Sequence, residues 1–83
     1  MSKKSNSEAN MDLDASDRRL IYDVIRTRES CGLSQTQLSK LCGTPQPLIS
    51  RIENGVHKPT TSSINRLLKP MGYKLAIVKD DSQ

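Results

Sequence analysis

The stretch from Leu33 to Gly55 constrains the fold most, because it carries two short amphipathic helices joined at a glycine. Ser34 is a good N-cap, since its hydroxyl can accept a backbone amide of the first turn. Leu38 and Leu41 follow three residues apart on one face. Gly43 can then leave the helix with a positive φ. The pattern predicts two helices in close succession with a turn at the glycine.

The second of these helices, which we expect Thr44 to cap, has two unlike faces. Its apolar residues Leu48, Ile49 and Ile52 share one side. At about 100° per residue, the opposite side presents small or hydrogen-bonding groups. A helix in the DNA major groove needs such a face, with amide and guanidinium groups for base edges and small residues for close approach. We therefore predict that this face reads DNA bases through Pro45, Gln46, Pro47, Ser50 and Arg51.

Three blocks of residues carry a resemblance to a known family: Leu33-Ser34-Gln35, then Leu38, then Ile49 to Gly55. In these blocks the chain resembles the phage repressor and Cro (XRE) type of helix-turn-helix domain, over roughly residues 17–73. The alternative is that two amphipathic helices meet at a glycine in any helical bundle. The gapless spacing across both motifs favours the repressor type. The resemblance implies a compact, mainly α domain of four to five helices.

The resemblance also implies roles for individual residues. Arg28 matches an arginine that pairs with the glutamate near the end of the recognition helix, here Glu53, and a half-buried guanidinium suits such a structural ion pair. Gln35 matches a glutamine that contacts the DNA backbone and braces the recognition helix. The predicted phosphate contacts are Ser34, Gln35, Thr36, Lys40, Asn54 and Lys58.

The recognition helix departs from the family pattern at its prolines. Pro45 and Pro47 both lie in the first turn, where a missing amide is tolerated. Pro47 disfavours helical dihedrals at Gln46, so we expect the helix to begin a residue or two late, and the direction of Gln46 stays open. Leu48 stands where the family often has a small polar residue, and it either packs inward or reaches a thymine methyl.

Two further helices are predicted on either side of this motif. Ser16 and Asp17 are typical of a helix start, and an apolar stripe then runs to about Ser30, with Gly32 ending the helix. The stripe comprises Leu20, Ile21, Val24 and Ile25. The last helix opens at residues 59–63 and ends near Lys69, because Pro70 interrupts it. Its core-facing residues are Ile64, Leu67, Leu68 and Met71.

The two ends of the chain have different predicted roles. Residues 1–14 are polar and predict a disordered tail before the domain at 15–72. Within this tail Lys3 and Lys4 could form an arm that enters a DNA groove, although an inert tail is favoured. Residues 73–79 predict one β-strand, which in a helical chain needs a partner strand from a second subunit. Dimerisation would use Tyr73, Leu75 and Ile77, and 80–83 would be a short tail; a fifth helix is the alternative.

Residues 71–78 also resemble the end of HipB-type antitoxins. That resemblance implies a homodimer, a palindromic operator and a HipA-like kinase toxin as partner. We therefore interpret the chain as a sequence-specific DNA-binding repressor and as an antitoxin. One alternative is a free-standing regulator, such as a phage repressor or a restriction-system controller. Another is an adaptor whose helix face binds protein.

Charge and composition agree with a nucleic-acid binder. The net charge is +4, and residues 16–58 carry seven basic and four acidic side chains. A zinc site needs about four ligands, and Cys31, Cys42 and His57 have neither the number nor the spacing for one. The sequence also lacks a grouping of nucleophile, histidine and acid that would indicate an enzyme. We expect no cofactor. The chain has no apolar run of membrane-spanning length and no signal segment, so we expect a cytoplasmic protein with reduced thiols.

Overall fold

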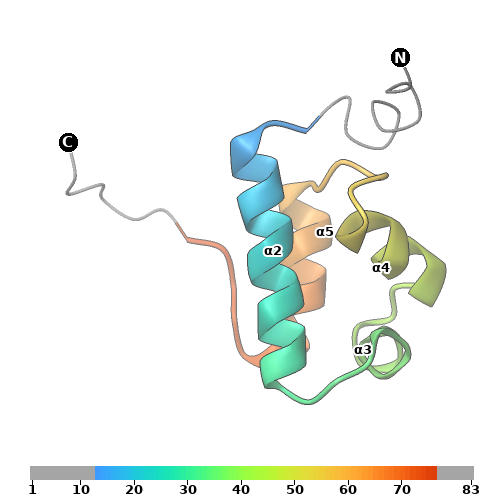
Figure 1. Ribbon diagram of the computed structural model, residues 1–83. Coiled ribbons are helices and arrows are strands. Elements are labelled where there is room, and N and C mark those ends of the chain that lie inside the picture. Colours follow the sequence, from blue (N-terminus) through green and yellow to red (C-terminus); the bar gives the residue numbers. More distant parts are fainter. Residues whose placement is uncertain (1–12, 77–83) are drawn as a thin grey trace.

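The computed structural model describes residues 13–76, which form four α-helices and one short 3-10 helix. In chain order the elements are α2 (Ala15–Ser30), α3 (Gln35–Cys42), α4 (Gln46–Glu53), α5 (Thr61–Leu68) and η1 (Lys69–Met71). The long α2 packs against α5, and the α3–α4 pair lies on one side of both (Figure 1). The predicted mainly α architecture is confirmed, with four α-helices in the described residues where four to five helices were expected.

The start of α2 is set by an aspartate pair and not by Ser16. The Asp17 amide donates to Asp14 Oδ1 at 2.9 Å, and the Asp14 amide donates back to Asp17 Oδ2 at 3.4 Å. This reciprocal capping box satisfies two amides that would otherwise lack partners at the helix start. Asp14, predicted as the end of the tail, therefore belongs to the domain, and residues 1–12 lie outside the described part. The helix ends before Gly32, as predicted.

The turn between α3 and α4 is partly as predicted. Ser34 caps α3, with the Gln37 amide donating to its hydroxyl at 3.0 Å, and Gly43 leaves the helix at φ +76°. The predicted Thr44 cap is wrong, because Thr44 is buried in the turn and its carbonyl accepts the Ser39 hydroxyl at 2.6 Å. Pro45 occupies the N-cap position instead, so α4 begins one residue later than a Thr44 cap would place it.

The core is aliphatic and lies between all four helices. It comprises Val24, Leu38, Ile49, Ile52, Ile64, Leu67 and Leu68. Leu48 packs against this cluster, which settles the question of its direction in favour of packing inward. Leu41 follows Leu38 by three residues, as noted in the sequence, but it is 57% exposed whereas Leu38 is fully buried.

The chain after Gly72 does not form the predicted strand over residues 73–76. The Tyr73 amide donates to the Leu68 carbonyl at 3.1 Å, and the Leu75 amide donates to Asn65 Oδ1 at 2.8 Å. These two backbone donors are satisfied by α5 of the same chain, so neither of them requires a second strand. Leu75, predicted at a dimer interface, packs against its own core, whereas Tyr73 is 57% exposed. Ile77 and the remainder of the predicted strand and tail lie outside the described residues.

Candidate nucleic-acid interface

The outer face of α4 is the surface that the sequence predicts to read DNA. Ile49 and Ile52 fix the other face, since both are fully buried. Of the five predicted base-reading residues, Pro45, Pro47 and Arg51 are exposed, while Gln46 and Ser50 are half-buried. In Figure 1, α4 lies at the outer edge of the molecule beside α3, so its outer face is not covered by another described helix.

The C-terminal end of α4 is joined to α2 by an ion pair. Arg28 Nε donates to Glu53 Oε2 at 2.8 Å, and Arg28 Nη2 donates to Glu53 Oε1 at 2.9 Å, the two-bond geometry that the resemblance implies. The two side chains are only 13% and 4% exposed. Arg28 Nη1 also donates to the Leu33 carbonyl at 2.8 Å. The hydrogen bonds to the Glu53 carboxylate raise the pKa of Arg28 above its ordinary value.

Two glutamines extend this ion pair to the first turn of α4. Gln35 Nε2 donates to Glu53 Oε1 at 2.8 Å, and Gln46 Nε2 donates to Gln35 Oε1 at 2.8 Å. A carboxylate only accepts hydrogen bonds, so Gln35 must turn its NH₂ toward Glu53 and its oxygen toward Gln46. The direction of Gln46, left open by the sequence, is thereby fixed. Its own Oε1 has no hydrogen-bond partner among residues 13–76 and is the acceptor that remains for a ligand.

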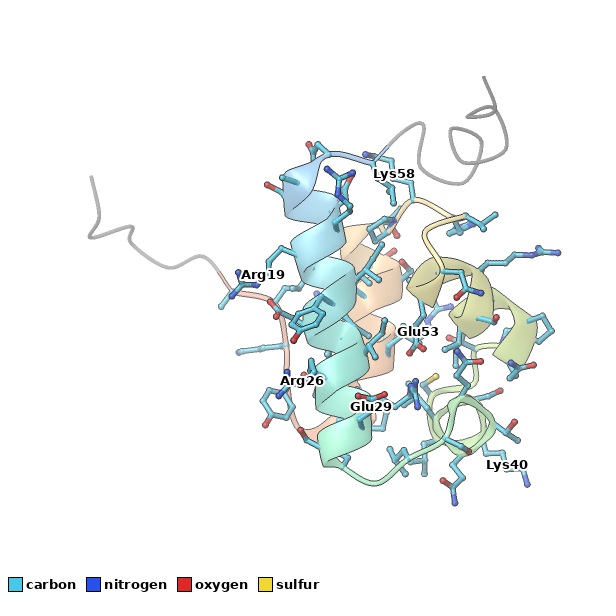
Figure 2. The ribbon with its side chains drawn as sticks, viewed as in Figure 1. Arg19, Arg26, Glu29, Lys40, Glu53 and Lys58 are labelled. Atoms are coloured by element: carbon cyan, nitrogen blue, oxygen red, sulfur yellow. The ribbon has the colours of Figure 1, made fainter. Side chains whose placement is uncertain are left out.

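The six predicted phosphate contacts do not all lie together. Figure 2 shows Lys40 on α3 at one end of the molecule and Lys58 near the start of α2 at the other. Lys58 Nζ donates to Asp17 Oδ2 at 2.7 Å. That hydrogen bond is the main reason why the pKa of Asp17 lies below its ordinary value. Sequence reasoning missed this partner, although Asp17 is an acid in the first turn of α2.

The other predicted contacts lie on or next to α3 and α4. Thr36 and Lys40 are exposed on α3, whereas the Ser34 hydroxyl is already occupied as the cap and Gln35 lies within the network. Asn54 follows α4, and its Nδ2 donates to the Ser50 hydroxyl at 3.3 Å.

The charge of this surface is positive. Together α3 and α4 carry two basic side chains, Lys40 and Arg51, and one acid, Glu53. Because Arg28 pairs with Glu53, no unpaired negative charge remains on these two helices. The arrangement can therefore attract an anionic ligand to the exposed side of α3 and α4.

Over the described residues, no group of three or more histidine, cysteine or acidic side chains is placed to bind a metal. None of the described helices is long and apolar enough to cross a membrane.

Comparison with known proteins identifies the family of this fold. A helix-turn-helix family model (HTH_3) matches residues 24–78. The chain is 44% identical over 59 residues to an uncharacterized HTH-type transcriptional regulator of Haemophilus influenzae (strain ATCC 51907 / DSM 11121 / KW20 / Rd), which is 71% of this chain and 60% of that protein. It is 33% identical over 61 residues to antitoxin HigA1 of Mycobacterium tuberculosis, in strains CDC 1551 / Oshkosh and ATCC 25618 / H37Rv.

The match to HigA1 covers 74% of this chain and 41% of the relative, so the chain spans less than two thirds of each of these relatives. No solved structure matches the chain. The matched family model covers α3 and α4 entirely, together with the residues that join them to α2 and α5. The chain therefore belongs to the XRE-type helix-turn-helix family of DNA-binding transcription regulators.

Proposed function

We propose that the protein is a sequence-specific transcriptional repressor that reads its operator with α4. One observation carries the proposal: α4 buries Ile49 and Ile52 completely, presents Pro47 and Arg51 to solvent, and has its first turn held by the Gln46–Gln35 hydrogen bond. A recognition helix reads base edges with its N-terminal part in the major groove, and a fixed first turn limits the entropy lost on binding.

The remaining roles follow from position and charge. Arg51 is the donor for guanine, because its guanidinium can donate two parallel hydrogen bonds to O6 and N7. Gln46 and Ser50 contribute further base contacts from the rim of the exposed face. The phosphate contacts are Ser34, Gln35, Thr36 and Lys40 around α3, and Asn54 and Lys58 after α4. For Lys58 this role requires that a DNA phosphate replace Asp17 as its partner.

We also propose that two copies bind a palindromic operator. An eight-residue helix contacts only a few base pairs, and two such helices placed about one DNA turn apart would supply the missing specificity. Of the three residues predicted for the subunit contact, Tyr73 is exposed and keeps this role in the proposal. Leu75 does not, because it packs within its own subunit.

Selection of bound duplexes from a random pool tests this function directly. We expect an inverted-repeat sequence to be enriched, and its affinity to fall with salt by a log–log slope of about 0.9 for each phosphate contacted. Sedimentation of the protein–operator complex should give two protein chains per duplex. Arg51→Ala should reduce sequence discrimination. Its matched control is Arg66→Ala, which removes an exposed basic residue of α5 and should leave discrimination unchanged. Binding with no sequence preference or no salt dependence would favour the protein-binding adaptor instead.

A second candidate function is that of an antitoxin, which the similarity to HigA1 favours. In this proposal the repressor also binds and neutralises a toxin protein. A HipA-like kinase as that toxin rests only on the resemblance of residues 71–78, and residues 73–76 do not form the strand expected of that type. Co-expression with the product of the neighbouring gene tests the proposal. A stable complex that restores growth supports the antitoxin, whereas growth arrest without a complex favours the free-standing regulator.

A further inference from the structure

The N-terminal end of α4 exposes apolar side chains on the surface that is proposed to read bases. Pro45 at the N-cap and Pro47 in the first turn are both exposed. Neither ring can donate or accept a hydrogen bond. Gln46 between them is half-buried, and its NH₂ group is engaged by Gln35. Two hydrocarbon rings are therefore exposed at this end of the helix, on either side of the half-buried Gln46.

The major groove offers these rings only one kind of apolar partner. In the major groove all four bases present hydrogen-bond donors or acceptors, and thymine alone adds an apolar group, its C5-methyl. The same methyl group, at the same ring position, is present in 5-methylcytosine. We propose that Pro45 and Pro47 read the C5-methyl group of a pyrimidine, so that the operator is recognised partly through a methyl contact. This inference rests on the proposed function and specifies the chemistry that the first turn of α4 selects.

The position of Arg51 places a second constraint on the same sequence. Pro47 and Arg51 are four residues apart on α4 and both are exposed, so they lie on one face with Cβ atoms about 5–6 Å apart. That separation corresponds to one or two base-pair steps of about 3.4 Å. If Arg51 donates to guanine, the methyl group read by Pro47 lies within two base pairs of that guanine. The geometry therefore favours half-sites in which a thymine or a 5-methylcytosine lies within two base pairs of a guanine.

Replacing thymine by uracil in the operator isolates this contact, because it removes the methyl group and leaves every hydrogen-bonding group in place. We expect one uracil position in each half-site to weaken binding about fourfold, as for the loss of one buried methyl-sized group. Placing 5-methylcytosine opposite guanine at that position should bind more tightly than unmodified cytosine by a similar factor. The same duplexes are then titrated with Pro47→Ala and Pro45→Ala.

The variant that lacks the reading ring should bind the thymine and uracil duplexes equally. Because each ratio compares two duplexes with one protein, a general loss of folding affects both affinities and cancels. Uracil sensitivity that is undiminished in both variants would assign the methyl contact to another residue and overturn the inference. DNA binding with no uracil-sensitive position would overturn the inference alone, whereas the absence of any DNA binding would overturn the proposed function as well.

Discussion

Replacing Arg28 by methionine removes a cation that contacts Glu53 and the Leu33 carbonyl at once. The substitution deletes two hydrogen bonds to the Glu53 carboxylate and one to Leu33. Glu53 is then left with a 4% exposed carboxylate whose remaining donor is Gln35. Removing one partner of a buried ion pair typically costs about 3–5 kcal/mol of unfolding free energy. We expect Arg28→Met to fall in that range.

The double variant Arg28→Met with Glu53→Met should be more stable than Arg28→Met alone, although it carries one more substitution. It leaves no buried charge, and two apolar side chains of similar length can pack against each other. Its cost is limited to the groups that lose a partner, the Leu33 carbonyl and the Gln35 amide. Both residues are half-buried and can reach water, so we estimate about 1–2 kcal/mol in total.

Urea denaturation followed by circular dichroism measures all these free energies. For a domain of this size each kcal/mol corresponds to about 4–8 °C in melting temperature, so thermal melts supply an independent reading. Arg19→Met is the matched control, because its ion pair with Asp23 on the same helix is 77% and 56% exposed. It should change stability by less than about 0.5 kcal/mol. Glu53→Met is measured alone in the same way, and if the double variant loses the sum of the Arg28→Met and Glu53→Met losses, Arg28 and Glu53 are not coupled and the reasoning is refuted.

Three further predictions concern other contacts. Arg51→Ala should cost about 1–3 kcal/mol of binding to the operator and much less on scrambled DNA; equal losses in filter-binding titrations would make Arg51 a phosphate contact. Asn65→Ala should speed hydrogen exchange at the Leu75 amide, while Asn65→Asp retains the acceptor and the protection; unchanged exchange in Asn65→Ala would contradict the contact. Lys58 lowers the pKa of Asp17, so the Lys58–Asp17 contact stabilises the fold above about pH 4. This stabilisation is lost as the pH falls through the lowered pKa of Asp17. The stability difference between wild type and Lys58→Gln should therefore shrink in acid, and a constant difference would exclude this titration.

The helices of this domain were predictable from local signals, because each depends on residues within one or two turns. Ser34 and Gly43 bound α3 as expected, since a cap and a positive φ are properties of the residues themselves. The N-cap of α4 was not predictable from residue type alone. Thr44 is the better cap by composition, but the Ser39 hydroxyl binds its carbonyl and the residue is buried in the turn. The contact with α3 therefore moved the N-cap of α4 to Pro45, and the helix begins at Gln46.

The C-terminal segment failed for a related reason. Its β-branched and apolar residues favour a strand, and a strand requires partners for its backbone amides. Asn65, ten residues earlier in the chain, supplies a side-chain acceptor that no hydrophobic periodicity reveals. The Leu75 side chain then packs on the core of its own subunit. The pattern of apolar residues was informative, but it could not distinguish burial within one subunit from burial between two.

The sequence predicted the Arg28–Glu53 pair and the bracing role of Gln35, but neither the hydrogen bond between Gln46 and Gln35 nor the direction of each bond. Arg28 and Glu53 are 25 residues apart, Gln35 and Glu53 are 18 apart, and Gln46 and Gln35 are 11 apart. Only the packing of α2, α3 and α4 places the charged pair next to an amide that can turn either way. Once the carboxylate accepts a hydrogen bond from the Gln35 NH₂ group, the direction of the next bond is fixed, and Gln46 keeps its Oε1 as an acceptor.

The hydrogen-bond network behind α4 links the stability of the domain to its discrimination between DNA sequences. In the proposed function Arg28 touches no DNA, yet its loss leaves Gln35 as the remaining donor to Glu53 and so loosens the chain of hydrogen bonds that orients Gln46 in the first turn of α4. Operator discrimination should therefore weaken in Arg28→Met even at temperatures where the variant is fully folded. Gln35→Met breaks the same network one step later and leaves the ion pair intact, so it should weaken discrimination with a smaller loss of stability. If the network both stabilises the fold and orients Gln46, Arg28→Met should lose stability and discrimination, and Gln35→Met should lose mainly discrimination. If the ion pair only stabilises the fold, Arg28→Met should lose stability alone.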